Sequence, residues 1–251
     1  MKRQLNTEYH FLEPFLNALP ARFESEGKTI YKGRNELKVF EVDGFQLNVK
    51  SYRVPNLLKR IMYSFFRQSK AKRAYNNAQF LLSKGFETPQ PVAYLECFSH
   101  GLLRESFFMS LQSSYGGLIK EFSDGSSIVG REDLIVSFGK LIAKVHNAGI
   151  LHLDLSGGNV LIQKMEDGYH FSLIDLNRMK FQEIGMKKGC QNFNRLRGNN
   201  DFFRLLAETY AKERGFNVQA CTNIVLKAKD KSIRYFARKK QLKKVFYSNY
   251  K

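Results

Sequence analysis

Acidic residues are scarce in this chain of 251 residues. Only 23 Asp and Glu stand against 41 Lys and Arg, which gives a formal net charge of +18 at pH 7. A surface with such an excess of positive charge favours anionic partners, and nucleotides, nucleic acid and anionic lipid all qualify. Charge alone does not choose among these three classes.

Cysteines and long apolar runs are also scarce. Cys97, Cys190 and Cys221 show no CxxC spacing and have no histidine pair nearby, so the sequence indicates neither a zinc site nor a disulfide framework. A reducing cytoplasm fits this cysteine usage. No stretch approaches the roughly 20 apolar residues that a membrane span requires, and the basic N-terminus lacks the apolar core of a signal peptide. We therefore expect a soluble or at most peripheral protein.

Strand patterns dominate the first part of the chain. Residues 29–52 read as two strands around the turn Asp43-Gly44, whose glycine tolerates the backbone angles of a tight hairpin. Lys50 would then lie near the end of a strand. The apolar spacing then becomes helical at residues 58–66 and 70–84. A second antiparallel pair of strands is expected at residues 89–98 and 105–112.

Helical patterns dominate the rest. Apolar residues between 131 and 147 recur at the spacing of a core-facing helix that Gly149 ends, and residues 192–251 are mostly helical in pattern. Tyr115-Gly116-Gly117 is a plausible break between the two parts. We therefore expect an α+β fold with a small antiparallel β-sheet lobe (residues 1–114) and a mainly helical lobe (residues 115–251).

One short segment carries the chemistry. The stretch HLDLSGGNVL places Asp154 two residues after His152 and Asn159 five residues after Asp154, and IDL supplies Asp175 further on. Taken singly, Asp154 and Asn159 could be ordinary turn or helix-cap residues. Together, in this order after a helix, they resemble the catalytic loop and metal-binding segment of protein kinases.

This resemblance implies a bilobal protein-kinase-like fold and a role for each residue. Asp154 would be the catalytic base that orients the attacking hydroxyl, and Asn159 and Asp175 would bind magnesium through oxygen atoms. Lys50 would pair with the phosphates of ATP, although an ordinary exposed strand lysine would fit the same position. His146 and His152 would be structural, because in kinases they pack behind the loop and brace its backbone.

Two departures from the kinase pattern affect the nucleotide site. The loop expected to cover the phosphates has one glycine, Gly33, which we assign to cofactor binding. No acidic residue lies between Asp43 and Glu87 to pair with Lys50, and Asn76 or Asn77 stands where the glutamate is expected. A hydrogen-bonded substitute, a glutamate from elsewhere, or weak activity would each account for this.

Over residues 30–201 the chain is similar to the bacterial lipopolysaccharide kinase family. Four segments carry this similarity: KSYRVPN, RAYNNAQFLLSKGFETPQPVAYLE, HLDLSGGNVL and IDLNR. This similarity implies a Gram-negative cytoplasmic enzyme that uses ATP and Mg²⁺ to phosphorylate a Kdo or heptose hydroxyl of the lipopolysaccharide inner core. It would act as a monomer on an anionic lipopolysaccharide precursor, peripherally at the inner face of the inner membrane.

Basic segments leave other functions open. The apolar spacing of residues 58–66, among many cations, suits a helix lying on anionic lipid, or one whose apolar face packs on the N-terminal lobe. The tail 227–251 mixes cations with aromatics, a pattern that also binds nucleic acid, which we treat as incidental. The alternative functions are a kinase for a protein or small-molecule hydroxyl, and a non-catalytic kinase-like module that binds an anionic partner.

Overall fold

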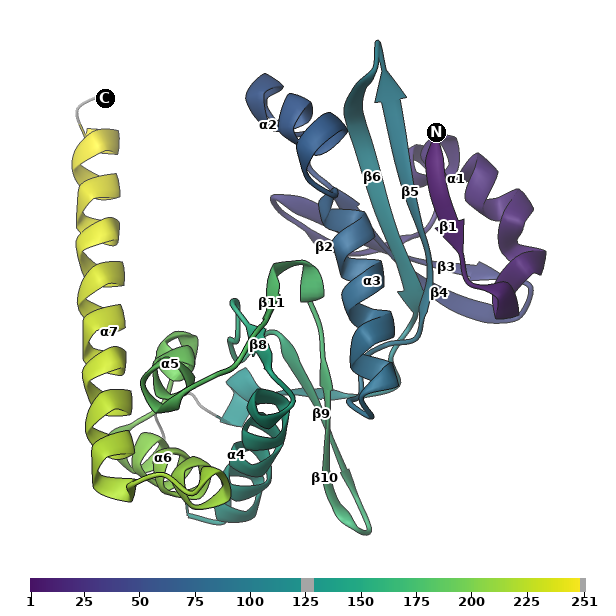
Figure 1. Ribbon diagram of the computed structural model, residues 1–251. Coiled ribbons are helices and arrows are strands. Elements are labelled where there is room, and N and C mark those ends of the chain that lie inside the picture. The colour runs from purple at the N-terminus through teal and green to yellow at the C-terminus, as the bar shows by residue number, and fades with distance from the viewer. Residues whose placement is uncertain (123–128, 249–251) are drawn as a thin grey trace. The chain divides into compact units, whose positions relative to one another are not determined.

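The computed structural model of the chain describes residues 1–122 and 129–248 (Figure 1). The chain divides into two compact units. The first contains Met1–Ser114 together with Leu173–Arg178, and the second contains Tyr115–Ser172 and Met179–Lys251. The short segment Leu173–Arg178, which includes Asp175, therefore belongs with the N-terminal residues although it comes late in the sequence.

A six-stranded antiparallel sheet forms the centre of the first unit, with strand order β1-β5-β6-β4-β3-β2 (Figure 1). The second predicted strand pair is confirmed as the hairpin of β5 and β6, which turns at His100 and Gly101 with positive φ at both residues. The strands are β1 (Lys2–Leu5), β2 (Lys28–Lys32), β3 (Asn35–Val42), β4 (Phe45–Tyr52), β5 (Pro91–Ser99) and β6 (Leu102–Leu111).

The hairpin predicted for residues 29–52 contains one more strand than expected. The turn at Asp43-Gly44 is confirmed, with φ of 49° and 79°. The segment before it, however, forms β2 and β3 instead of one strand. The chain reverses at Gly33, whose N–H donates to the Asn35 carbonyl at 3.0 Å. Lys50 lies in β4, between Leu37 of β3 and Phe108 of β6.

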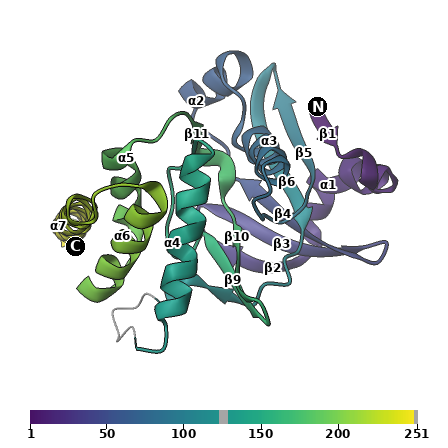
Figure 2. The same cartoon turned by 60° about the horizontal axis from the view of Figure 1, so that its bottom comes forward.

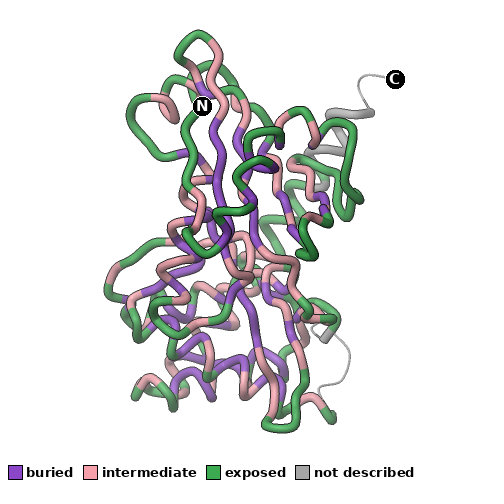
Figure 3. The backbone as a smooth tube through the Cα atoms, turned by 90° about the vertical axis from the view of Figure 1, so that its right-hand side faces the viewer, coloured by how far each residue is buried: buried purple, intermediate pink, exposed green. Residues whose placement is uncertain are grey.

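Two helices pack against the sheet, α1 (Glu13–Ser25) and α3 (Lys70–Ser83). Successive side chains of a strand point to opposite faces, so β4 contributes to two clusters. Leu47 and Val49 pack in the cluster that contains Leu16 and Leu19 of α1, whereas Tyr52 packs with Ala71 and Tyr75 of α3. Lys50 has the parity of Tyr52, and the strand therefore directs it to the face that α3 covers. Figure 3 shows which parts of the backbone are buried, half-buried or exposed.

Both predicted helices of the first unit form, one of them altered. The helix predicted for residues 70–84 is α3, capped by the Ser69 hydroxyl and followed by Gly85 at φ 74°. Residues 58–66 divide between a short helix α2 (Leu57–Ile61) and a π-helical turn (Met62–Phe66).

The second unit is mainly helical, as predicted. Its helices are α4 (Glu132–Asn147), α5 (Met186–Gln191), α6 (Asn200–Arg214) and α7 (Val218–Ser248). α4 packs on α6, and α6 and α5 pack on α7 (Figure 2). The smaller sheets are β10-β9-β7 and β11-β8, formed by β7 (Gly117–Leu118), β8 (Ile150–His152), β9 (Val160–Met165), β10 (Gly168–Leu173) and β11 (Met179–Phe181). The helix predicted for residues 131–147 is thus confirmed as α4, and Gly149 follows it at φ 73°.

Candidate active site

The residues of the predicted catalytic loop lie between β8 and β9. The Asp154 N–H donates to His152 Nδ1 at 3.1 Å, and the Leu155 N–H donates to the His152 carbonyl at 3.2 Å. The Asn159 side-chain amide donates to the Asp154 carbonyl at 2.8 Å. The structure thus holds two of the predicted site residues, Asp154 and Asn159, in one hydrogen-bonded loop.

His146 and His152 brace this loop from within the second unit. Both are 2% exposed. Asn192 connects them, because its amide N–H donates to the His152 carbonyl at 3.0 Å and its Oδ1 lies 3.1 Å from His146 Nε2. Burial lowers the pKa of His146 to about 4, so its imidazole is neutral at pH 7 and cannot exchange protons usefully near that pH. These contacts agree with a structural role for both histidines.

Arg195 is a site residue that the sequence analysis missed. Its guanidinium forms an ion pair with the Asp154 carboxylate, through Nη1 and Oδ1. Arg195 ends the 3-10 turn Asn192–Arg195, which is anchored by the buried Phe193 and by the hydrogen bonds of Asn192. The two ion-paired residues are 41 positions apart and match no fixed spacing, so no local signal could have identified this arginine.

Gly157 lets the loop approach its neighbour closely. A Cβ at this position would lie 2.8 Å from the Lys120 backbone N and Cα atoms, and Lys120 N–H donates to the Gly157 carbonyl at 2.9 Å. A backbone neighbour cannot rotate away as a side chain can. Any larger residue at Gly157 would therefore displace the turn that connects Asp154 to Asn159.

Lys50 and Asp175 form an ion pair in the first unit, with Nζ 2.7 Å from Oδ1. Their side chains are only 14% and 24% exposed, so water screens this pair less than it screens a surface pair. Asp175 adopts φ 59°, which is unusual for a residue other than glycine. Its Oδ1 also accepts a hydrogen bond from the Asn177 amide at 2.6 Å. The acidic partner of Lys50, absent from residues 44–86, is therefore the predicted magnesium ligand itself.

Helix α3 holds the segment that carries Asp175. Arg73 and Asn77 are four residues apart and so lie on one face of the helix. Asn77 donates to the Leu176 carbonyl at 2.6 Å, and Arg73 Nε donates to the Asn177 carbonyl at 3.1 Å. Asn77 thus stands where a glutamate was expected, but it acts on the backbone beside Asp175 and does not contact Lys50 through these bonds. This explains how a helix without an acidic residue contributes to the site.

Replacing Asn77 with alanine is expected to destabilise the protein. The buried Leu176 carbonyl would lose its donor, which typically costs about 1–3 kcal/mol in the free energy of unfolding. Asn76→Ala is the matched control, because Asn76 lies on the same helix and donates to the exposed Gln68 side chain at 3.3 Å. We expect this variant to change stability by less than about 0.5 kcal/mol. Urea denaturation of both variants measures the difference. Equal effects would show that Asn77 does not hold the Asp175 segment.

Gly33 occupies the turn between β2 and β3. A Cβ there would lie 2.8 Å from the Tyr31 ring carbon Cζ. Because the Tyr31 ring is exposed and able to move, this contact alone does not require glycine at position 33. The assignment of Gly33 to nucleotide binding therefore stays a prediction.

The oxygen ligands predicted for magnesium suit this metal. Mg²⁺ prefers hard oxygen atoms and often takes one or two protein ligands, with phosphates and water completing its octahedron. Because the Asn159 NH₂ is engaged by the Asp154 carbonyl, its amide oxygen points away from that bond. The Asp175 carboxylate would supply a second hard donor. Within residues 1–122 and 129–248, no group of three or more His, Cys, Asp or Glu could hold a metal alone.

Comparisons with known proteins give a consistent result. Residues 25–213 match the family described as "Lipopolysaccharide kinase (Kdo/WaaP) family". Two proteins described as 3-deoxy-D-manno-octulosonic acid kinase are each 27% identical to the chain. The protein from Pasteurella multocida aligns over 64% of this chain and 68% of its own length, and the protein from Vibrio parahaemolyticus over 74% and 77%.

A solved structure described as "WaaP in complex with acyl carrier protein" has the same fold. It superposes with a TM-score of 0.64 and covers 93% of this chain and 99% of its own, at 18% sequence identity. At this identity the likeness concerns the fold alone. Together with the family match it confirms the predicted α+β, bilobal, protein-kinase-like fold.

Proposed function

Since this chain belongs to the lipopolysaccharide kinase (Kdo/WaaP) family, we propose that it transfers the γ-phosphate of ATP to a Kdo hydroxyl of the lipopolysaccharide inner core. The chain is a kinase, and HLDLSGGNVL, one of the four segments that predicted the family, carries Asp154 and Asn159. The choice of Kdo over heptose is supported by the two relatives described as kinases of 3-deoxy-D-manno-octulosonic acid.

The ion pair of Lys50 and Asp175 is the observation that carries the proposal. A non-catalytic module was an alternative because Lys50 had no acidic partner in the neighbouring sequence. The ion pair removes this reason for a non-catalytic module, because Lys50 does have an acidic partner. That partner, Asp175, is a carboxylate that can bind metal. Lys50 would bind the ATP phosphates, and Gly33 in the adjacent β2–β3 turn would let the backbone approach them.

Asp154 would act on the acceptor. Phosphoryl transfer requires mainly positioning and charge neutralisation, and the protein's proton chemistry is confined to the attacking hydroxyl. The Asp154 carboxylate would accept a hydrogen bond from that hydroxyl, orient its oxygen toward phosphorus, and take its proton as the new P–O bond forms. The His152 and Asn159 hydrogen bonds fix the backbone of this residue.

Magnesium would be held by Asn159 and Asp175. When bound, the ion would neutralise charge on the ATP phosphates as the bond to the leaving group breaks. Asn177 and Lys50 would keep the Asp175 carboxylate oriented, because both donate to its Oδ1.

The proposed place of action is the cytoplasmic face of the inner membrane, where the protein would associate peripherally as a monomer with its anionic lipid-linked acceptor. In the part of the chain that the structure describes, no helix is long and apolar enough to cross a membrane. The excess of positive charge favours an anionic surface.

An acceptor panel tests this function. Labelled ATP and Mg²⁺ would be supplied with a Kdo-containing lipid A precursor, a heptose-containing inner core, an aminoglycoside, or a generic protein substrate. We expect label on the Kdo acceptor, located on the sugar by mass spectrometry. Label on the protein or the aminoglycoside alone would favour the broader kinase alternative, and failure to bind Mg²⁺-ATP would favour the non-catalytic module.

A further inference from the structure

We propose that α2 and the π-helical turn that follows it form a docking element that inserts into an anionic phospholipid surface. This inference deepens the proposed function, because it names the surface through which the protein would reach a lipid-linked acceptor. Its principal test measures lipid binding without catalysis. The two proposals can therefore fail separately.

Large apolar side chains of this segment point into solvent. Leu58 is 77% exposed, Phe65 67% and Phe66 83%. Packing of this face on the N-terminal lobe, one of the two interpretations open from the sequence, is therefore wrong for these residues. Exposed apolar side chains that cluster on one element mark an interaction surface more often than isolated ones do.

Hydrogen bonds to β6 hold the segment in this conformation. Arg60 Nε donates to the Leu103 carbonyl at 2.9 Å, the Ser64 hydroxyl donates to the Arg60 carbonyl at 2.7 Å, and the Leu103 N–H donates to the Ser64 hydroxyl at 2.8 Å. The polar side of the segment is thus fixed to the sheet. Its apolar side chains are presented outward by a defined structure and not by a loose end.

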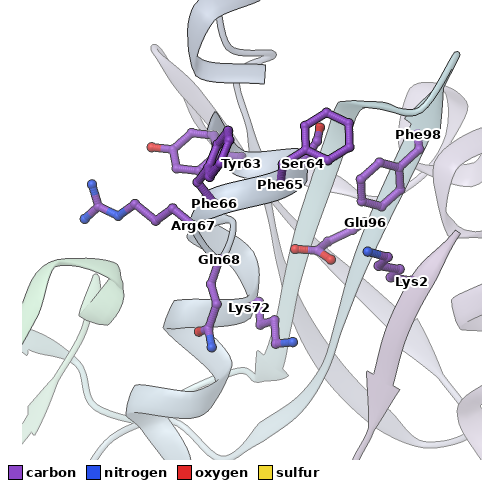
Figure 4. A pocket seen from close by; sticks show the side chains of 10 residues that line it. All are labelled: Lys2, Tyr63, Ser64, Phe65, Phe66, Arg67, Gln68, Lys72, Glu96 and Phe98. Atoms are coloured by element: carbon purple, nitrogen blue, oxygen red, sulfur yellow. The ribbon is translucent and has the colours of Figure 1, made fainter. Parts of the chain in front are cut away.

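Three cations lie near the two phenylalanines of the turn. Beside the turn lies a cavity of ≈ 230 Å³ (Figure 4), where the ammonium groups of Lys2 and Lys72 lie on the side toward Glu96, below the rings of Phe65 and Phe98. Arg67 lines the same cavity. No acidic residue occurs between Asp43 and Glu87. The element thus combines apolar insertion with positive charge, the combination that binds anionic interfaces.

Charge favours a lipid surface over a second copy of the chain. Two copies, each with a net charge of +18, would repel when their basic faces meet. An anionic bilayer attracts the same basic face. It also accepts phenylalanine side chains at the boundary between headgroups and acyl chains, which a purely polar surface does not do.

Vesicle flotation tests the element. The native protein is expected to bind vesicles containing phosphatidylglycerol, to release them at high salt, and to ignore pure phosphatidylcholine. Replacing Phe65 and Phe66 together with serine should weaken binding by roughly 100-fold, given the transfer free energy of two phenyl groups. Phe11→Ser is the matched control, because Phe11 is also exposed but has Glu8 and Glu13 near it in sequence. We expect that control to bind as the native protein does.

Two results would overturn the inference: native protein that does not float with anionic vesicles, or a double variant that floats as well as the control. The double variant should also transfer phosphate at the native rate to a water-soluble, deacylated Kdo acceptor and more slowly to the acceptor in vesicles. Equal slowing on both acceptors would place Phe65 and Phe66 in the folding or catalysis of the kinase and contradict a docking role.

A different observation, the ion pair of Arg195 with Asp154, carries a second inference that rests on the proposed function. We infer that Arg195 binds the carboxylate of the acceptor sugar and so determines specificity for an acidic sugar. The acceptor hydroxyl must come within hydrogen-bond distance of Asp154, which places the acceptor beside the Arg195 guanidinium. The Arg195 side chain is 40% exposed against 19% for that of Asp154. The five N–H donors of the guanidinium suffice for two anions.

The support of Arg195 suits this role. Buried Phe193 and the Asn192 hydrogen bond to the His152 carbonyl fix the turn that carries it. An arginine held in this way loses less side-chain entropy when it binds a carboxylate, and a planar guanidinium matches the two oxygens of that group. The two relatives described as kinases of an acid sugar act on an acceptor with such a carboxylate.

Kinetics with a modified acceptor test this inference. Loss of a charge-assisted hydrogen bond is expected to raise the KM for the Kdo acceptor roughly 10- to 100-fold in Arg195→Gln, with partial recovery in Arg195→Lys. The native enzyme should show the same loss when the acceptor carboxylate is a methyl ester, and Arg195→Gln should no longer distinguish acid from ester. A variant that retains the native preference for the acid, or that loses kcat at unchanged KM, would contradict it. A native enzyme that transfers nothing to Kdo would instead refute the proposed function.

Discussion

Asp154→Asn is expected to lower kcat for phosphate transfer by about 10²–10⁴-fold, the usual contribution of a general base. Asparagine preserves the shape of the side chain and the backbone hydrogen bonds to His152 and Asn159, but it cannot accept the proton of the acceptor hydroxyl. Because Asp154 would contact the acceptor and not the nucleotide, the affinity for Mg²⁺-ATP, measured by calorimetry, should remain close to that of the native protein.

Asp167→Asn is the matched control, because it removes a carboxylate charge by the same Asp-to-Asn change at a site outside the predicted active site. Asp167 is an exposed carboxylate whose side chain contacts His170 of β10, and we expect transfer to be unchanged. An Asp154→Asn variant that keeps more than about a tenth of the native kcat would show that another group takes the proton, since a positioned base seldom contributes so little.

Lys50→Met has the second-largest expected effect, a fall in transfer rate of about 10²–10³-fold, comparable to the loss of one preorganised electrostatic donor. The variant removes the proposed phosphate contact and also leaves the Asp175 carboxylate without its cation at 2.7 Å. Weaker binding of Mg²⁺-ATP should accompany the slower transfer, so calorimetry gives a measurement that is independent of turnover.

Lys164→Met is the matched control for Lys50. Lys164 is an exposed lysine on strand β9, near the Tyr169 ring, and thus represents the ordinary strand lysine that Lys50 could have been. It should bind ATP and transfer phosphate as the native protein does. If both variants bound ATP equally well, Lys50 would not contact the nucleotide.

Elements and motifs that depend on a local pattern could be predicted from the sequence. The helix at residues 70–84 had clear periodicity and a following glycine, and it was predicted within one residue of its observed end. The hairpin turn at Asp43-Gly44 was predictable from its dipeptide. The order of Asp154, Asn159 and Asp175 predicted the fold, because kinase-like loops require these residues at these spacings.

Contacts between distant residues could not be predicted in this way. Asp175 is 125 residues from Lys50, and Arg195 is 41 residues from Asp154; only the folded chain brings each pair together. Asn77 was recognised as the residue in the position of a missing glutamate, but its bond to the Leu176 carbonyl depends on where the Asp175 segment lies. Periodicity likewise indicated an apolar face at residues 58–66 without showing whether the protein covers it.

The most direct test of the central claim is Mg²⁺-dependent transfer of labelled phosphate from ATP to a purified Kdo-containing lipid A precursor, by the native protein and by Asp154→Asn in parallel. We predict label on the Kdo sugar with the native protein, little or none with the variant, and none when Mg²⁺ is chelated. Equal label with both proteins, or none with a native protein that binds Mg²⁺-ATP, would contradict the assignment of this chain as a Kdo kinase that uses Asp154.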